Sequence, residues 1–263
     1  MKKWALILGS SSGFGAATSI ELAKKGFNIF GVHFDRKVNM PKVEKVINKI
    51  KEQGVEVEFF NLNAADPNNR KYVLDKIEER FKNDSEENSI FVVMHSLVFG
   101  TLRKLIAEDK EEALNQKQLE MTLDVMANQL VYWVQDTFYR GLFKNGGRIF
   151  AMVSSGDERV FPYYGAVSAA KAAIESYIRQ LAYELAPFGI TANAIKAGVT
   201  DTPALRKIPG NEELVKLAKL KNPSKRLTTT EDIGKAIAAL TDKNLHWMTG
   251  NVIRVDGGED LAA

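Results

Sequence analysis

Apolar and polar positions alternate along the whole chain between two kinds of segment. Short continuous apolar runs, typical of strands buried on both faces of a parallel sheet, are separated by stretches with the spacing of amphipathic helices. The predicted strands are residues 4–8, 27–34, 55–61, 90–94, 147–153, 190–196 and 251–255. Strands that alternate with helices predict an α/β fold, a doubly wound parallel sheet of seven strands with helices on both faces.

The helices between these strands are predicted from apolar periodicity and from the residues that end them. The predicted helices are residues 16–25, 41–53, 67–82, 118–142, the segment after the fifth strand up to residue 185, and 231–240, and the charged segment 101–115 also favours a helix. The connection after the sixth strand is long and contains a possible short helix at 212–221. We interpret residues 1–263 as one domain in which about residues 199–226 form a lid over a ligand site.

A glycine-rich loop follows the first predicted strand and precedes the first predicted helix. Glycines let the backbone turn tightly and approach a pyrophosphate, and the helix N-terminus offers free N–H groups and a positive dipole. This order of strand, glycines and helix predicts a Rossmann-type dinucleotide site. The residues of the loop expected to bind the cofactor are Gly9, Ser11, Ser12, Gly13, Phe14 and Gly15.

The second strand ends in residues that bear on which dinucleotide binds. Asp35 is followed by Arg36 and Lys37. An acid at this place favours a free ribose 2′-hydroxyl, whereas basic residues favour a 2′-phosphate, and both chemistries are present within three residues. We interpret the loop as favouring NADPH, and NADH is the alternative. A further interpretation is a solvated charged loop whose residues do not contact the cofactor.

Composition limits the chemistry of this domain. The net charge is +3 with 26% charged residues, and no basic stripe points to a nucleic-acid partner. The absence of cysteine excludes disulfides and thiolate catalysis, and three widely spaced histidines form no metal-ligand pattern. No segment of the sequence has the pattern of a signal peptide or a membrane span, so we expect a soluble, cytoplasmic protein without a membrane partner.

Polar and aromatic residues gather where the fifth strand passes into the next helix. Ser154 and Ser155 end the strand, Tyr163 and Tyr164 follow, and Lys171 lies on the helix. In α/β sheets, ligands bind outside the carboxyl ends of the strands. This stretch is therefore expected to form a hydride-transfer active site.

Several short motifs together resemble the short-chain dehydrogenase/reductase family over essentially the whole chain. They are Gly9-x-x-x-Gly13-x-Gly15, Asn63-Ala64, Ser154-Ser155, the tyrosine and lysine of the next helix, Asn193-Ala194 and Val255-Asp256-Gly257-Gly258. Each motif is weak alone, but jointly they are very specific. The resemblance implies an NAD(P)H-dependent oxidoreductase.

The departures from the common family pattern are more informative. The family's tyrosine usually precedes the lysine by four residues, but that position is Val167 here, and Tyr164 lies seven before Lys171. This longer spacing resembles the divergent enoyl-ACP reductases, as do the segment His95 to Gly100 and the pair Ala197-Gly198. The loop from Gly9 to Gly15 keeps the common form, and that mixture most resembles the type III bacterial enoyl-ACP reductase, which is usually NADPH-dependent.

The longer spacing has a physical meaning. Positions four and seven before a lysine fall on nearly the same helix face, and the Cα of Tyr164 would lie about 4.5 Å further toward the N-terminus at ~1.5 Å per residue if that turn is helical. An enoyl reductase delivers hydride to Cβ and stabilises an enolate oxygen two atoms away, which a displaced donor suits. Reduction of an enoyl thioester in fatty-acid synthesis is therefore expected. The alternatives are a carbonyl reductase or alcohol dehydrogenase acting on a 3-oxoacyl or other ketone, and a silent nucleotide-binding scaffold.

The resemblance also implies roles for the catalytic residues. Tyr164 should donate a hydrogen bond to the developing enolate, and Lys171 should bind the nicotinamide ribose and lower the pKa of the tyrosine or relay protons. Tyr163 is the rival of Tyr164. Ser154 matches the family's catalytic serine, although a structural hydroxyl is equally plausible and Ser155 is the alternative. The family's catalytic asparagine falls near Met126, and Asn128 lies two positions away.

The remaining expected contacts also follow from the resemblance. For the cofactor they are Asn63 and Ala64 at the adenine, Ser96 and Lys171 at the ribose, and Ala197, Gly198, Thr200 and Thr202 at the carboxamide and pyrophosphate end. An apolar acyl pocket could be formed by Leu97, Phe99, Phe161, Leu205 and Ile208, any of which could instead be core. The implied partners are an acyl thioester on acyl carrier protein or coenzyme A and further copies of the chain, as a tetramer or dimer.

Overall fold

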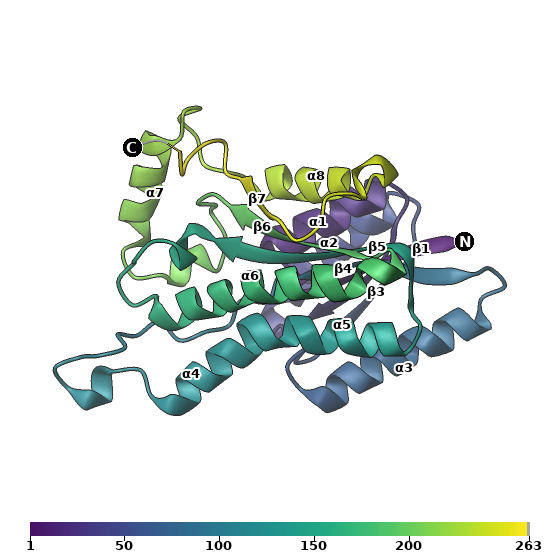
Figure 1. Cartoon of the computed structure of the whole chain (residues 1–263), viewed down its shortest axis with the longest axis horizontal. Coiled ribbons are helices and arrows are strands. Elements are labelled where there is room, and N and C mark those ends of the chain that lie inside the picture. Colours follow the sequence, from purple (N-terminus) through teal and green to yellow (C-terminus); the bar gives the residue numbers. More distant parts are fainter. Residues whose placement is uncertain (262–263) are drawn as a thin grey trace.

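The sheet at the centre of the molecule has seven strands, all parallel, in the order β3-β2-β1-β4-β5-β6-β7 (Figure 1). The computed structural model describes residues 1–261, apart from the side chain of Asn145. The strands are β1 Lys2–Leu8, β2 Asn28–His33, β3 Val57–Asn61, β4 Asn88–His95, β5 Phe143–Ser154, β6 Thr191–Ala197 and β7 Val252–Val255. The predicted Rossmann-type sheet of seven strands is confirmed.

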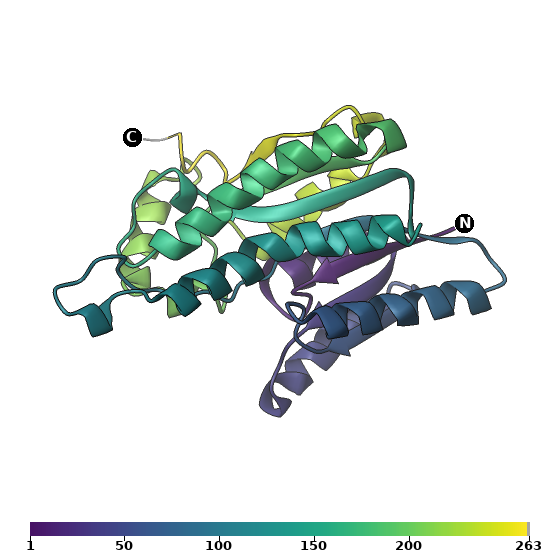
Figure 2. The same ribbon diagram turned by 60° about the horizontal axis from the view of Figure 1, so that its bottom comes forward.

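The helices that pack on the sheet divide between its two faces (Figures 1 and 2). The helices of the chain are α1 Gly13–Lys24, α2 Met40–Lys51, α3 Pro67–Asn83, α4 Gln116–Leu123, α5 Gln129–Tyr139, α6 Gly165–Leu185, α7 Asn211–Lys221 and α8 Thr230–Leu240. Side chains of α3, α5 and α6 form one apolar core with the sheet, and side chains of α1, α2 and α8 form the other. Both faces of the central strands are therefore covered, which explains why these strands are apolar throughout. Among the residues described, no helix is both long enough and apolar enough to cross a membrane.

The reversal of strand order between β1 and β4 opens the sheet at its carboxyl end. β1 pairs with β2 on one side and with β4 on the other, so the connections after β1 and after β4 depart in different directions. At this switch point the Ser96 N–H donates to the Leu8 carbonyl over 2.9 Å, which holds the two strand ends together. This is the position at which doubly wound sheets bind their ligands.

The long predicted helix 118–142 is present as α4 and α5, joined by a π-helical turn at Asp124–Asn128. The predicted helix at 101–115 is wrong. Its only helical turn within the described chain is a short 3-10 turn, Lys110–Glu112, and the Leu114 N–H donates to the Lys104 carbonyl as in a loop. Leu105 and Ile106 are mostly exposed, so the segment has no packed apolar face to support a helix.

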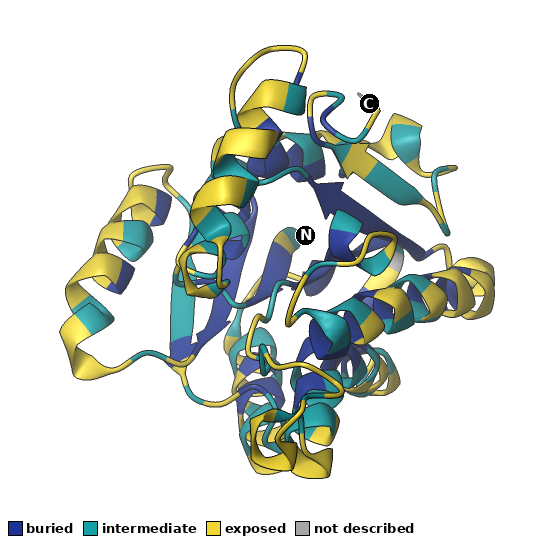
Figure 3. Cartoon of the chain, turned by 90° about the vertical axis from the view of Figure 1, so that its left-hand side faces the viewer, coloured by how far each residue is buried: buried dark blue, intermediate teal, exposed yellow. Residues whose placement is uncertain are grey.

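The long connection after β6 contains α7, which confirms the short helix predicted at 212–221. Figure 3 views the molecule from the side on which α7 lies in Figure 1, and most of this helix is exposed. Within α7, Ala218 is the buried residue. Few apolar contacts hold such an element in place, and this is typical of segments that open at low free energy.

Candidate active site

The loop between β1 and α1 can be built only from glycine at its critical positions. Gly9 and Gly13 have φ values of +91° and +56°, which favour glycine. Gly15 has no such φ, but a Cβ there would lie 2.1 Å from the Gly9 carbonyl oxygen. Ser12 precedes α1 in an extended conformation, and no side chain of the described residues caps the first N–H groups of the helix. The tight loop and the uncapped helix start fit a pyrophosphate.

Segments from other strand ends surround this loop. A Cβ on Gly9 would lie 2.5 Å from the Ser96 carbonyl oxygen, and one on Gly13 would lie 3.8 Å from Thr202 Cγ2. Thr200 and Thr202 are buried, and Thr200 Oγ1 donates to the Gly198 carbonyl over 2.9 Å. The structure thus brings the predicted residues after β1, β4 and β6 to one place. Ala197 ends β6, and Gly198 follows it directly.

The turn after Gly198 is packed from behind. A Cβ on Gly198 would lie 2.4 Å from Thr228 Oγ1, so a larger residue would displace this segment. The buried Glu259 carboxylate accepts the Val199 N–H at 3.2 Å. Burial raises the pKa of Glu259, and the Val199 hydrogen bond opposes that rise. The C-terminal turn therefore supports the start of the 199–226 segment.

Asp35 and Arg36 lie after β2, as expected for the adenosine end. The Asp35 carboxylate lies 3.0 Å from Nδ1 of the buried His33. Asn61 holds the Asp35 backbone on both sides, because its amide oxygen accepts the Asp35 N–H at 2.9 Å and its amide nitrogen donates to the Asp35 carbonyl at 3.0 Å. Arg36 is exposed. Asp35 is thus fixed, whereas Arg36 is free to approach a ligand from solvent.

Asn63 and Ala64 follow β3 and form a turn of their own. Asn63 Oδ1 accepts the Ala65 N–H at 3.0 Å, and the Ala64 carbonyl accepts the indole N–H of Trp133 at 2.9 Å. Asn63 is exposed and Ala64 is buried. Trp133 of α5 thereby fixes the turn, a contact that the sequence did not reveal.

Three of the predicted catalytic residues lie where β5 meets α6. Ser154 ends β5, and its Oγ lies 3.3 Å from the hydroxyl of Tyr164. Tyr164 is the residue before α6 rather than part of the helix, with φ −96° and ψ 0°. Lys171 lies on α6, buried, and its Nζ donates to the Met152 carbonyl of β5 at 2.8 Å. The structure therefore brings the tyrosine, the serine and the lysine together at the carboxyl end of β5.

The two other positions considered for the tyrosine differ in environment. Val167, where the common family pattern has tyrosine, is 5% exposed and belongs to the apolar core beside α6. Tyr163 has φ +64°, an unfavourable value for a bulky residue, and is 39% exposed. Of the two tyrosines, Tyr164 is the one hydrogen-bonded to Ser154. Ser155 begins the short 3-10 turn Ser155–Asp157.

Burial is the largest influence on the pKa values of Tyr164 and Lys171. It raises the pKa of the Tyr164 phenol, and the hydrogen bond with Ser154 opposes the rise. Burial lowers the pKa of Lys171 to about 8, and the charge of Asp157 opposes that shift. Lys171, expected to lower the pKa of the tyrosine or to relay protons, is not among the groups that shift this pKa, and loss of hydration of the phenolate is the largest effect. Tyr164 is a phenol, and hence a hydrogen-bond donor, at neutral pH.

His95 lies at the end of β4 and begins the segment His95 to Gly100. It is fully buried, and its Nε2 donates to the Val125 carbonyl at 3.3 Å, within the π-helical turn. Burial, followed by the positive charge of Lys171, lowers the pKa of His95 to about 3. The neutral ring thus fixes the π turn against the sheet. Met126 in that turn is buried, and Asn128 accepts the hydroxyl of Tyr177 at 2.9 Å.

The predicted acyl pocket is brought together only in part. Phe161 packs edge-on against Tyr164, with ring centroids 6.1 Å apart. Leu97 is half-buried against the core, whereas Phe99 is mostly exposed. Leu205 and Ile208 are half-buried at the 3-10 turn Leu205–Lys207 of the 199–226 segment. Leu105, which sequence reasoning missed, lies against the start of α6, since a Cβ on Gly165 would meet it at 3.0 Å.

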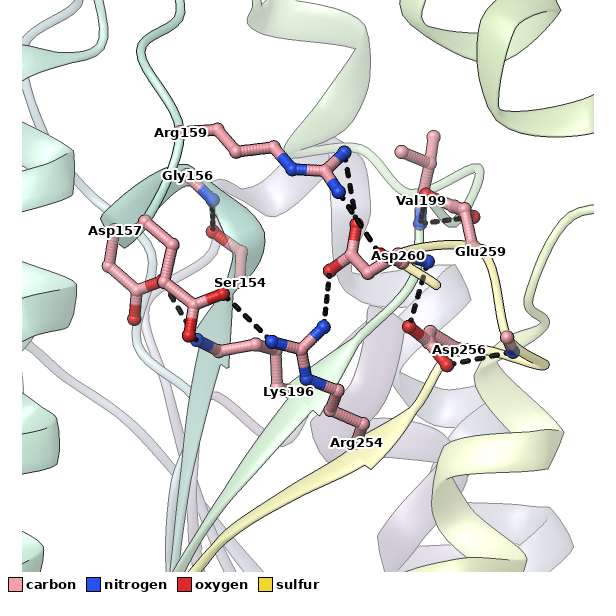
Figure 4. Close-up of polar contacts among 12 residues, drawn as sticks. Ser154, Gly156, Asp157, Arg159, Lys196, Val199, Arg254, Asp256, Glu259 and Asp260 are labelled. Atoms are coloured by element: carbon pink, nitrogen blue, oxygen red, sulfur yellow. Dashed lines mark hydrogen bonds and ion pairs between the residues drawn. The ribbon is translucent and has the colours of Figure 1, made fainter. Parts of the chain in front are cut away.

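A buried ion cluster next to Ser154 was also missed. Lys196 of β6 is surrounded by Asp157, Glu158 and Glu175, and Figure 4 shows Asp157 reaching Lys196 from the turn that follows Ser154. The signal in the sequence was a charged residue, Lys196, as the last residue of the predicted strand 190–196 and followed by the apolar Ala197. Among the described residues, no group of three or more acidic or histidine side chains has an arrangement that could hold a metal ion.

Comparison with known proteins relates the chain to a family of reductases. The sequence model of the family described as Enoyl-(Acyl carrier protein) reductase matches residues 9–259. The chain is 29% identical to an uncharacterized oxidoreductase, YjdA, of Bacillus subtilis (strain 168), over 98% of this chain and 96% of the relative. It is 27% identical to the enoyl-[acyl-carrier-protein] reductase [NADH] FabI of Buchnera aphidicola subsp. Baizongia pistaciae, over 100% of this chain and 96% of the relative.

A solved structure shares the fold over nearly the full length of both chains. The crystal structure of the enoyl-[acyl-carrier-protein] reductase (NADH) of Aquifex aeolicus VF5 superimposes with a TM-score of 0.84 at 24% identity, covering 99% of this chain and 97% of that one. The glycine loop, the strand order and the family match therefore agree. The chain belongs to the enoyl-(acyl carrier protein) reductase family of the short-chain dehydrogenases/reductases and is an NAD(P)H-dependent oxidoreductase.

Proposed function

We propose that this enzyme reduces the carbon–carbon double bond of an enoyl thioester. The observation that carries the proposal is the position of its tyrosine. Tyr164 lies before α6 with its hydroxyl against Ser154, seven residues from Lys171, while the usual tyrosine position, Val167, is filled by an apolar side chain in the core. The hydrogen-bond donor is therefore displaced from the place that a ketone reductase uses for its proton donor.

The side chains suit this reaction. When bound, the nicotinamide cofactor supplies the hydride. Hydride addition at Cβ leaves negative charge on the thioester oxygen, and the Tyr164 hydroxyl donates a hydrogen bond to that oxygen. Because burial raises the pKa of the phenol, Tyr164 keeps its proton and remains a donor. Ser154, 3.3 Å away, orients the hydroxyl.

Lys171 acts as a fixed cation near the carboxyl end of β5. One of its N–H groups is held by the Met152 carbonyl, which leaves two for the ribose hydroxyls of the cofactor. With a pKa of about 8, the amine is mostly protonated at neutral pH and attracts the developing negative charge. Its burial strengthens that attraction, because little water screens it.

NADPH is the cofactor that we propose. Asp35 is tied to His33 and Asn61, whereas the exposed Arg36 is available for a 2′-phosphate. NADH remains the second candidate, since Asp35 could accept a free 2′-hydroxyl. The loop after β2 supports either choice, and the ratio of kcat/KM for the two cofactors decides between them.

The acyl group that we propose is a thioester of acyl carrier protein, in cytoplasmic fatty-acid synthesis. Phe161, packed edge-on against Tyr164, offers apolar surface for the acyl chain, and the half-buried Leu205 and Ile208 of the 199–226 segment are further candidates to line its path.

Exposed tyrosines on α5 and α6, namely Tyr139 and Tyr183, also support a homo-oligomer built on these helices. Light scattering of the purified protein tests the assembly.

A ketone is the second candidate substrate. The contact between Tyr164 and Ser154 could also polarise a carbonyl oxygen, since a serine beside a phenol serves either bond. The test is to mix the purified enzyme with NADPH or NADH and offer a trans-2-enoyl thioester in parallel with the matching 3-oxoacyl thioester. We expect cofactor oxidation with the enoyl substrate, and oxidation with the ketone alone would refute the proposal.

A further inference from the structure

Lys196 is a charged residue in the interior of the protein. It lies on β6, with its side chain 1% exposed. Its Nζ lies 3.0 Å from Asp157 Oδ1, 2.8 Å from Glu158 Oε1 and 3.0 Å from Glu175 Oε1. Burying an ammonium is unfavourable unless it is paired in good geometry. Three carboxylates around one ammonium satisfy that need, and they also gather excess negative charge.

The cluster joins three elements that carry or adjoin the catalytic residues. Asp157 ends the 3-10 turn that begins directly after Ser154. Glu175 lies on α6, four residues after Lys171, and therefore one turn along the same helix face. Lys196 sits on β6, paired with β5 so that Lys196 is opposite Val153. One ammonium group thus ties the strand, the turn and the helix around Ser154, Tyr164 and Lys171.

A second layer of ion pairs closes over the same turn (Figure 4). Arg254 of β7 donates to Glu158 Oε2 at 3.0 Å, and it lies 3.6 Å from Asp260. Arg159 donates to the Asp260 carbonyl at 3.2 Å and lies 3.3 Å from its carboxylate. The C-terminal turn therefore holds the outer side of the segment whose inner side is held by Lys196.

The cluster also acts on the catalytic groups through charge. The negative charge of Asp157 opposes the lowering of the Lys171 pKa and adds to the raising of the Tyr164 pKa, in both cases after the larger effect of burial. The pKa of Glu175 is raised by burial and then by its hydrogen bond with Asp157. Burial alone would lower the pKa of Lys196, but the surrounding carboxylates outweigh it and raise the pKa. Lys196 therefore remains charged and offsets Asp157.

We propose that Lys196 is a positioning residue of the active site, which holds Asp157 so that the turn keeps Ser154 against Tyr164 and which offsets the negative charge that Asp157 directs at Tyr164 and Lys171. The proposal rests on the role proposed above for Tyr164, but it does not depend on whether the substrate is an enoyl thioester or a ketone. The charged groups that face Lys196 are Asp157, Glu158 and Glu175, with Arg254 behind Glu158.

The test compares three variants with the wild-type enzyme on whichever substrate it reduces. Lys196→Met removes the charge, Lys196→Arg keeps it, and Lys196→Met combined with Asp157→Asn removes both partners of the buried pair. Lys76→Met, which removes an exposed lysine paired with Glu79 on α3, is the matched control. The readouts are kcat, KM, cofactor Kd and the pH dependence of kcat.

We expect Lys196→Met to lower kcat by roughly 10- to 100-fold, the loss expected when a catalytic group shifts by about 1 Å, with the cofactor Kd near wild type. The alkaline limb of the pH profile should move to higher pH, because uncompensated negative charge makes Tyr164 and Lys171 hold their protons more tightly. Lys196→Arg should leave the limb in place, and the double variant should return it toward wild type.

A wild-type kcat and pH profile in Lys196→Met would overturn the proposal. It would also be overturned if the alkaline limb of the double variant were no closer to wild type than that of Lys196→Met. If Lys196→Met does not fold, Asp157→Asn alone decides, because it keeps Lys196 and removes the carboxylate charge. It should move the alkaline limb to lower pH, and an unmoved limb would overturn the proposal. Preference for a ketone would refute the proposed function while leaving this comparison intact.

Discussion

The hydroxyl of Tyr164 lies 3.3 Å from Oγ of Ser154, across the junction between β5 and α6. The two residues are close because Ser154 ends the strand and Tyr164 directly precedes the helix, so the connecting turn folds back on itself. A donor held in this way, at the strand end where the buried Lys171 binds the Met152 carbonyl, is preorganised for a negative oxygen.

Tyr164→Phe should remove most of the turnover. Loss of one donor to a developing oxyanion lowers kcat by about 10²- to 10³-fold, whereas cofactor affinity should stay near wild type because the phenol is assigned to the substrate. Stopped-flow turnover and cofactor titration by fluorescence measure both quantities. Tyr163→Phe is the matched control and should keep wild-type activity. If the two variants exchanged these phenotypes, the role would belong to Tyr163.

Ser154→Ala should have a smaller effect with a diagnostic pH dependence. The hydrogen bond with Ser154 opposes the raised pKa of Tyr164, so its loss should move to higher pH the part of the alkaline limb of kcat that reports Tyr164, which lies above the part that reports Lys171. A hydrogen bond of about 1 kcal/mol corresponds to a roughly fivefold change in kcat. Ser155→Ala is the control. An unchanged limb in Ser154→Ala would mean that the serine only caps the turn, where its Oγ accepts the Gly156 N–H at 3.3 Å.

Gly15→Ala should disrupt the glycine loop by steric overlap alone. Its Cβ would lie 2.1 Å from the Gly9 carbonyl oxygen, a contact that only backbone movement can relieve. We expect a loss of about 1–3 kcal/mol of stability and weakened cofactor binding. Gly26→Ala, at the other end of α1, is the control, because it introduces strain at φ +81° with no atom within 4 Å. That variant should lose stability and keep its cofactor Kd.

Arg36→Ser should shift cofactor preference from NADPH toward NADH. The exposed guanidinium is the group assigned to the 2′-phosphate, and one such charge-assisted contact contributes about 1.5–3 kcal/mol, or a roughly 10- to 100-fold change in the ratio of kcat/KM values. Lys42→Ser, on the nearby helix α2, is the control for a general loss of positive charge. A ratio unchanged by Arg36→Ser would assign the selection to Asp35.

His95 should make the protein lose stability as pH falls below about 6.5. Its folded pKa is lowered from 6.5 to about 3, so the unfolded chain takes up a proton in this window and the folded chain does not. Stability conferred by the neutral ring is present above pH 6.5 and should fall by about 1.4 kcal/mol per pH unit below it.

Urea unfolding across this acidic window measures the slope. His95→Gln, which can still donate to the Val125 carbonyl, should remove most of it while the free energy of unfolding near neutral pH changes less. Asp84 and Asp232 have pKa values lowered from 3.8 to about 2. Their contribution to stability is therefore lost only at lower pH, as the pH falls from about 3.8 toward about 2. A slope that persists in His95→Gln would contradict the assignment.

The two helix predictions in long connections had different outcomes. The segment 212–221 forms α7 although Ala218 is its buried residue, and it carries acidic residues in its first turn and lysines in its last, which suit the helix dipole. The segment 101–115 also has helix-favouring residues, but it exposes Leu105 and Ile106 and forms a short 3-10 turn, so helix-favouring composition alone did not separate the two. The π turn at Asp124–Asn128 left no sequence signal, because it depends on His95 from another strand.

The amino-acid sequence by itself determined the sheet, the glycine loop and the spacing between Tyr164 and Lys171. These features depend on local patterns, namely strand-length apolar runs, glycines where a side chain cannot fit and a helical repeat. Only the tertiary structure decided that Lys196 meets Asp157 and Glu175, that His95 is buried beside the charge of Lys171, and that burial raises the pKa of Tyr164. Those properties depend on distance and desolvation between segments that the fold, and not the order of residues, brings together.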